Sequence, residues 1–183
     1  VSFFRHIEGF PSELARAERN ARILLDAGFT SAYSAGSIIE MPIEVALRDK
    51  IRAGAIPGPR FLAAAAERDN HPVNPAGHAR VDWVGPEASA RWVHEKAAQG
   101  FDSIKFLVSN DDVFTPGGSM ITEYSAEELN AAGQAAREEG VWLNGHCQSP
   151  ESVKLAVTAG FRSIYHCTYA DPEALALLEP VKD

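Results

Sequence analysis

Residues 100–105 read GFDSIK, and this stretch decides the fold class that the sequence predicts. A glycine closes a helical pattern, an apolar run follows, and a lysine ends the stretch. Residues 140–146 (GVWLNGH) and 160–166 (GFRSIYH) repeat this order, each with a histidine at the end. Because glycine is the usual residue just beyond a helix, each stretch predicts a helix end followed by a buried strand. The titratable side chain then falls at the carboxyl end of the strand.

Helical and strand patterns alternate through the rest of the chain. We expect helices over residues 12–27, 42–53, 86–99, 125–139, 150–159 and 172–178, and strands over residues 29–35, 60–65, 102–108, 141–145 and 162–165. Ser125 and Glu128 stand in capping-box spacing at the start of one helix. Such alternation is typical of βαβ units and a parallel sheet.

A helix-to-strand junction recurs three times, at residues 27–31 (AGFTS), 99–103 (QGFDS) and 159–163 (AGFRS). A barrel of equivalent units has such repeats, and so does a doubly wound sheet, so the repeat leaves both open. Five strand–helix units are fewer than the eight of a complete barrel. We therefore expect this chain to be part of a larger protein.

Composition narrows the class of protein. The chain has 183 residues, 45% of them hydrophobic, which is enough for one core. Its net charge is −8 and no basic stripe is present, so nucleic acid and anionic membranes are poor partners. No apolar run is long enough to span a bilayer. Two cysteines make no disulfide framework, which indicates a reducing, cytoplasmic location.

Lys105, His146 and His166 are the candidate chemical groups, because each comes five or six residues after the glycine that opens its strand pattern. A strand-end lysine can simply extend to water, or its neutral amine can serve as a nucleophile or as a metal-binding carbamate. A single histidine at such a position is usually structural. Two imidazoles and a lysine at equivalent positions of three successive strands favour a metal site instead.

Both histidines are followed by a cysteine, but side chains alternate between the faces of a strand. We therefore expect Cys147 and Cys167 to face the helices as small packing residues. The same alternation returns Gln148 and Thr168 to the face of the histidines, which makes them candidate substrate contacts.

Two long loops follow strands, at residues 67–85 and 109–123. In barrel enzymes such loops contact the substrate. His78 in the first loop is a candidate substrate contact. We interpret Asp111 and Asp112 in the second as solvated loop residues.

Eight stretches, in this order along the chain, resemble the metal-dependent amidohydrolase superfamily, in particular its imidazolonepropionase-like and prolidase-like branch. They are residues 27–31, 58–60, 77–78, 85–87, 101–105, 125–129, 145–146 and 159–166. The resemblance covers nearly the whole chain. It implies an α/β fold, a (β/α)8 TIM barrel of amidohydrolase type.

The resemblance also implies a binuclear metal centre, usually of two zinc ions. Lys105 matches the carboxylated lysine that bridges the metals, and His146 and His166 match two histidine ligands. His78 matches a loop histidine near the substrate, and Gln148 stands where the family has a second fifth-strand histidine. The implied activity is hydrolysis of a C–N bond in an amide, peptide, urea or carbamate by a metal-activated hydroxide, on a small molecule or short peptide.

The chain departs from the family pattern at both ends. The first-strand His-x-His pair and the eighth-strand aspartate that shuttles the proton are absent, so we expect no catalytic residue of that kind here. Residues 1–183 then correspond to strands two to six of one catalytic barrel domain, incomplete at both ends. Tyr33 and Ser34 replace the Arg-Asp common after the second strand.

Two other hypotheses stay open. The chain is a truncated, non-catalytic piece, or the protein is a metal-free barrel enzyme that uses Lys105 as a Schiff-base nucleophile. Assembly into a homo-oligomer is also left open.

Overall fold

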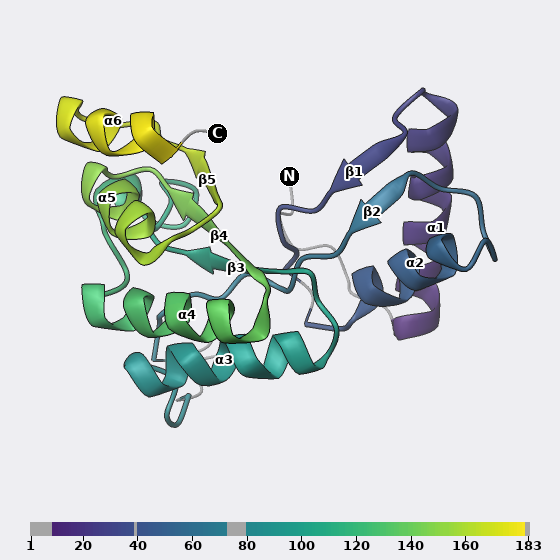
Figure 1. The fold of residues 1–183 in the computed structure, drawn as a ribbon, viewed down its shortest axis with the longest axis horizontal. Helices are drawn as coiled ribbons and strands as arrows, with labels where there is room; N and C mark the ends of the chain where they lie inside the picture. Colours follow the sequence, from purple (N-terminus) through teal and green to yellow (C-terminus); the bar gives the residue numbers. More distant parts are fainter. Residues whose placement is uncertain (1–8, 39, 73–79, 182–183) are drawn as a thin grey trace.

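The computed structural model describes residues 9–38, 40–72 and 80–181, and it shows helices and parallel strands in two lobes (Figure 1). The first lobe holds α1 (Phe10–Asp26), β1 (Ser31–Tyr33), α2 (Ile43–Arg52) and β2 (Arg60–Leu62). The second holds α3 (Pro86–Ala98), β3 (Ser103–Leu107), the 3-10 turn η1 (Gly118–Met120), α4 (Ala126–Glu139), β4 (Trp142–Cys147), α5 (Pro150–Ala159), β5 (Ser163–His166), α6 (Pro172–Leu178) and η2 (Glu179–Val181).

The described strands form two small parallel sheets, of order β1-β2 and β3-β4-β5. The segment after β2 connects them, because Ala64 and Arg68 form isolated parallel bridges with Ser103 and Phe106. The predicted α/β class with parallel strands is therefore confirmed. The bridges are intermittent, which is why the strands divide into two sheets instead of one.

The predicted junctions are confirmed in detail. Gly28, Gly100 and Gly160 all have positive φ, and β1, β3 and β5 each begin at the serine three residues later. The capping box of Ser125 and Glu128 is present at the start of α4. β1 and β2 are shorter than expected, whereas β4 runs two residues past its predicted end at Gly145, to Cys147.

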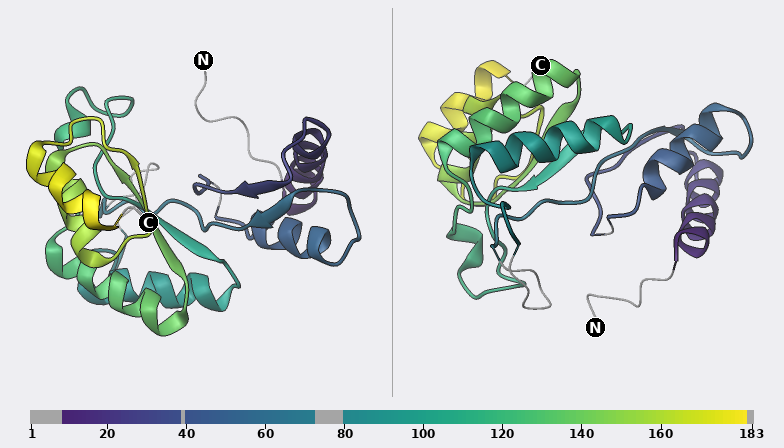
Figure 2. Two further views of the ribbon diagram at one scale, coloured as in Figure 1. Left: turned by 45° about the horizontal axis from the view of Figure 1, so that its top comes forward. Right: turned by 90° about the horizontal axis from the view of Figure 1, so that it is seen from below.

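Helices α3 to α6 lie on the side of the β3–β5 sheet that is turned away from the first lobe (Figure 2). Ile104, Phe106, Leu143 and Cys147 on that face are buried in the hydrophobic core. Alternation sends the intervening side chains to the opposite face. We call this the site face and define it by Lys105, Asn144, His146 and Tyr165, which the strand register places together.

An ion pair joins the two lobes. Arg48 of α2 donates to Asp102 Oδ2 at 2.8 Å and to the Gly100 carbonyl at 2.6 Å. The Ala63 amide donates to the same Asp102 oxygen at 2.8 Å. Asp102 therefore fixes α2, the segment after β2 and the start of β3 to one another. No helix in the described part of the chain is long and apolar enough to cross a membrane.

Candidate active site

Lys105 and His146 lie on the site face of neighbouring parallel strands, Lys105 in the middle of β3 and His146 near the carboxyl end of β4. Lys105 pairs in register with Asn144, and His146 pairs with Leu107, so the two side chains are two steps apart on one face. Their exposed fractions are 6% and 7%. The structure thus brings these two predicted residues together in a buried setting.

His166 reaches the same place by a different route. It is in register with Cys147, whose side chain faces the helices, so a regular strand would turn His166 away from His146. Instead φ is 75° at His166 and 50° at Cys167. The His166 ring lies edge-on against the His146 ring, with centroids 4.4 Å apart. Positive φ outside glycine is costly and tends to occur at functional sites, which fits this placement.

Two residues that the sequence did not single out contact Lys105. Glu67 Oε1 lies 3.2 Å from Lys105 Nζ, and the Tyr165 ring centroid lies 5.0 Å from the same atom. Gly36, with φ of 104°, lies so close that a Cβ there would fall 2.8 Å from Lys105 Cβ. The sequence held one indication of Glu67, because this carboxylate directly follows the apolar run of residues 63–66.

Gln148 and Asp111 lie beside His146. Gln148 Nε2 is 3.2 Å from His146 Nε2 and donates to Asp111 Oδ2 at 2.8 Å, while Thr168 Oγ1 donates to Gln148 Oε1 at 3.1 Å. Asp111 Oδ2 is itself 3.4 Å from His146 Nε2. The interpretation of Asp111 as a solvated loop residue is therefore wrong. Its loop folds back over the end of β4, and no local pattern in the sequence encodes that contact.

The environment favours neutral His146. Burial lowers its pKa, the neighbouring His166 and Lys105 add to this effect, and Glu67 and Asp111 oppose it. A neutral imidazole is the form that binds metal ions.

The side chains at this site are of the types that bind divalent metals. The imidazoles of His146 and His166 are in contact, and Lys105, which could carry a carbamate, lies two register steps from His146. Among residues 9–38, 40–72 and 80–181, however, no group of three or more His, Cys, Asp or Glu side chains is placed to hold a metal ion. Metal binding by Lys105, His146 and His166 therefore stays a prediction. His78, the predicted loop contact, lies outside the described residues.

The two cysteines are packing residues in the structure. Cys147 is buried in the core, and Cys167 is partly buried against it. Burial raises the pKa of both thiols, which makes them poor nucleophiles and poor metal ligands.

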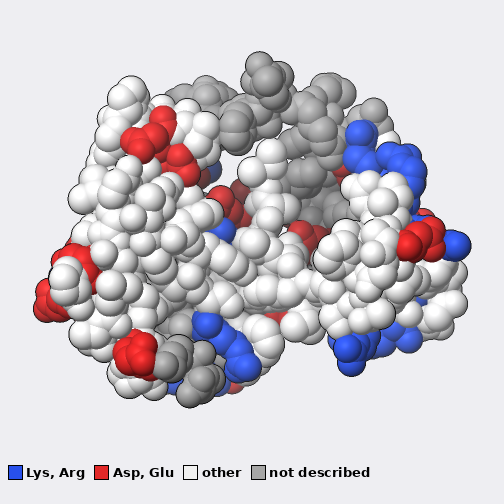
Figure 3. All heavy atoms as spheres, turned by 90° about the horizontal axis from the view of Figure 1, so that it is seen from above, with Lys and Arg blue, Asp and Glu red and all other residues white. Residues whose placement is uncertain are grey.

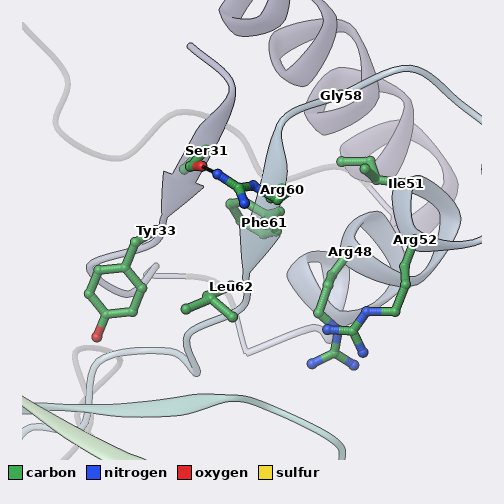
Figure 4. Close-up of a pocket in the computed structure, with 10 residues that line it drawn as sticks. Ser31, Tyr33, Arg48, Ile51, Arg52, Gly58, Arg60, Phe61 and Leu62 are labelled. Atoms are coloured by element: carbon green, nitrogen blue, oxygen red, sulfur yellow. Dashed lines mark hydrogen bonds between the residues drawn. The ribbon is translucent and has the colours of Figure 1, made fainter.

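A pocket of about 730 Å³ lies in the first lobe, between β1, β2 and α2 (Figure 4). Arg48 and Arg52 enter it from α2, while Arg60 is turned toward Ser31. None of the predicted site residues lines it. We therefore place the candidate chemistry at the cluster around Lys105 and His146 and not in this pocket.

No protein-family model matches the sequence, and no curated protein matches it. Solved structures do match. They include a Xaa-Pro dipeptidase with methionine bound in its active site (TM-score 0.83, 24% identity, 99% of this chain and 47% of that chain). A candidate prolidase from Bifidobacterium longum matches with a TM-score of 0.77 and 28% identity, over 91% of this chain and 39% of that chain. The ochratoxinase of A. niger matches with a TM-score of 0.80 and 20% identity, over 98% of this chain and 47% of that chain.

The chain thus spans about half the length, or less, of these structures. Another matching structure is described as an amidohydrolase. The structural neighbours of this chain are prolidase-like and amidohydrolase-superfamily proteins, as the resemblance in its sequence predicted.

Proposed function

We propose that this chain is the central part of a (β/α)8 TIM-barrel hydrolase that is metal-dependent and breaks a C–N bond in an amide, peptide, urea or carbamate. One observation carries the proposal. Lys105, in the middle of β3, and His146, near the carboxyl end of β4, are buried together on one face of the sheet, with the His166 ring against His146. Barrel enzymes build their active sites at that end of the strands.

The neighbours support the general kind of reaction. The matching structures include a dipeptidase, a molinate hydrolase and a phenylurea hydrolase B, which are hydrolases acting on C–N bonds. The substrate of this protein is accordingly expected to be a small molecule or a short peptide.

Lys105, as a carbamate, together with His146 and His166 would hold two divalent ions, with zinc as the expected metal. Such ions lower the pKa of bound water and polarise a carbonyl group. Glu67 and the Tyr165 ring contact the unmodified Lys105 amine, and the Glu67 ion pair would have to give way when the carbamate forms. Gln148 offers an amide to the substrate, and His78 is a further proposed substrate contact. The aspartate that would shuttle the proton is expected outside this chain.

Metal analysis of the full-length protein tests the proposal. We expect about two metals per complete site, loss of turnover with a chelator, and its return with zinc. Lys105→Ala and His146→Ala should lose both metal and turnover. Lys154→Ala serves as the matched control, because Lys154 pairs with Asp171 and Glu173 at the surface and should keep both.

Three results would contradict or redirect this proposal. A metal-free protein with full activity would exclude it. Borohydride trapping of a carbonyl substrate on Lys105 would support the Schiff-base alternative. Chelator-sensitive turnover by residues 1–183 alone would exclude the view that the chain is a non-catalytic piece.

A further inference from the structure

Asp111 forms an ion-pair contact with His146, a predicted metal ligand. Among the described residues of its loop, it is the only one that does so. Its Oδ2 accepts a hydrogen bond from Gln148 Nε2 at 2.8 Å and lies 3.4 Å from His146 Nε2. Its side chain is 21% exposed, so the carboxylate is partly buried but still accessible. Gln148, a proposed substrate contact, and Asp111 thus form one polar pair beside His146.

Hydrogen bonds within the loop orient Asp111 and its carboxylate. The Val113 amide donates to Asp111 Oδ1 at 2.9 Å, which leaves Oδ2 turned toward Gln148. The amides of Phe114 and Thr115 donate to the Asp111 carbonyl at 3.0 and 3.2 Å. Gly118 packs so closely that a Cβ there would fall 2.5 Å from that carbonyl oxygen. A preorganised group binds a ligand without the entropic cost of being ordered first.

No lysine or arginine side chain among the described residues neutralises the charge of Asp111. The Gln148 amide that contacts it is neutral. Glu67, by contrast, is paired with Lys105, and Asp112 is exposed and bonded to a serine of its own loop. The face drawn in Figure 3 is hollowed between the two lobes, and charged side chains lie within the hollow.

We propose that Asp111, oriented by Gln148, is a specificity-determining residue that selects substrates with a cationic side chain, an ammonium or guanidinium group, on the residue that carries the scissile carbonyl. A partly buried, oriented carboxylate attracts a cation far more strongly than a solvated one does. This inference rests on the proposed hydrolase function and names the class of substrate for that same site.

Kinetics on matched dipeptides test it in the metal-loaded full-length protein. Lys-Pro, norleucine-Pro and Glu-Pro share the α-ammonium group and the scissile bond, and they differ mainly in the charge of the side chain. We expect kcat/KM for Lys-Pro to exceed that for norleucine-Pro by about 10-fold to 100-fold, the range of a charge-assisted hydrogen bond, and Glu-Pro to be the poorest. Asp111→Asn keeps the shape of the side chain and should abolish the preference for Lys-Pro over norleucine-Pro, which is read from the ratio of the two kcat/KM values and not from the absolute rates.

Asp112→Asn is the matched control, because it removes the same charge from the same loop and should leave the preference intact. Salt provides a second measurement that needs no variant: raising ionic strength should lower kcat/KM for Lys-Pro more than for norleucine-Pro. An equal loss on all substrates in Asp111→Asn, with loss of metal, would make Asp111 a metal ligand and overturn the inference. Hydrolysis without charge preference would overturn it too, whereas no hydrolysis of any C–N substrate would count against the proposed function itself.

Discussion

Glu128 connects three separate segments around the helices of the second lobe. Its Oε1 accepts from the Gly85 amide at 2.8 Å and from Asn70 Nδ2 at 3.0 Å, and its Oε2 accepts from the Ser125 amide at 2.8 Å. Burial raises its pKa, but these hydrogen bonds outweigh burial, so the pKa lies below the usual 4.5. Glu128 therefore stabilises the fold in its charged form.

Glu128→Gln should make the protein's stability less dependent on pH. Because the folded pKa of Glu128 is depressed, its contribution is fully present above about pH 4.5 and is lost as pH falls through the folded value. We expect Glu128→Gln to lower the free energy of unfolding by about 1–3 kcal/mol at pH 7. Urea titrations at pH 7 and at pH 3.5 should show the difference shrinking in acid.

Glu127→Gln is the control for this experiment, since Glu127 is exposed on the same helical turn. Its effect should stay within about 0.5 kcal/mol at both pH values. A constant penalty for Glu128→Gln across this range would show that shape, and not charge, accounts for its role.

At the scale of elements, α4 and α5 are in close contact because α4 presents a glycine. A Cβ on Gly133 would overlap the Ala159 carbonyl at the end of α5. Gly133 is buried, and the helix around it is otherwise rich in alanine and glutamate. The closeness of this contact sets how α5, and with it the start of β5, lies against the second lobe.

Gly133→Ala should destabilise the protein although alanine favours helices. Alanine gains about 1 kcal/mol in helix propensity, but the overlap is with backbone that cannot rotate away, and overpacking costs about 1–3 kcal/mol. We expect a net loss in thermal unfolding temperature. Asn130→Ala, at an exposed position of the same helix, should leave that temperature unchanged or raise it slightly; an equal rise in both variants would refute the close contact.

At the scale of the whole molecule, the two lobes differ in how much core they hold. The large hydrophobic cluster is centred on β3, β4 and helices α3 to α5, whereas β1 and β2 contribute partly exposed strands. Asp102 and Arg48 connect the lobes at the start of β3. Local opening is easiest where few apolar contacts are buried, so the first lobe is expected to open before the second.

Asp102→Ala should loosen this connection. Removing the carboxylate leaves the Ala63 amide without its acceptor and takes one of three acceptors from Arg48, which should cost about 2 kcal/mol. Hydrogen exchange should then speed up in α1, β1 and α2 while amides of β3 and β4 keep their protection. Asp49→Ala is the matched control, because Asp49 also bonds Arg48 but is exposed, and its loss should change exchange little.

The sequence by itself determined the order and kind of the elements, their glycine junctions, and the placement of Lys105 and His146 on successive strands. These features follow from local periodicity and helix capping, which neighbouring residues encode together. The turn of His166 onto His146, the pairing of Glu67 with Lys105 and the contact of Asp111 with Gln148 were decided only by the tertiary structure. Each depends on strand register, an irregular backbone angle or a folded-back loop, and these arise from contacts between segments that are distant in the chain.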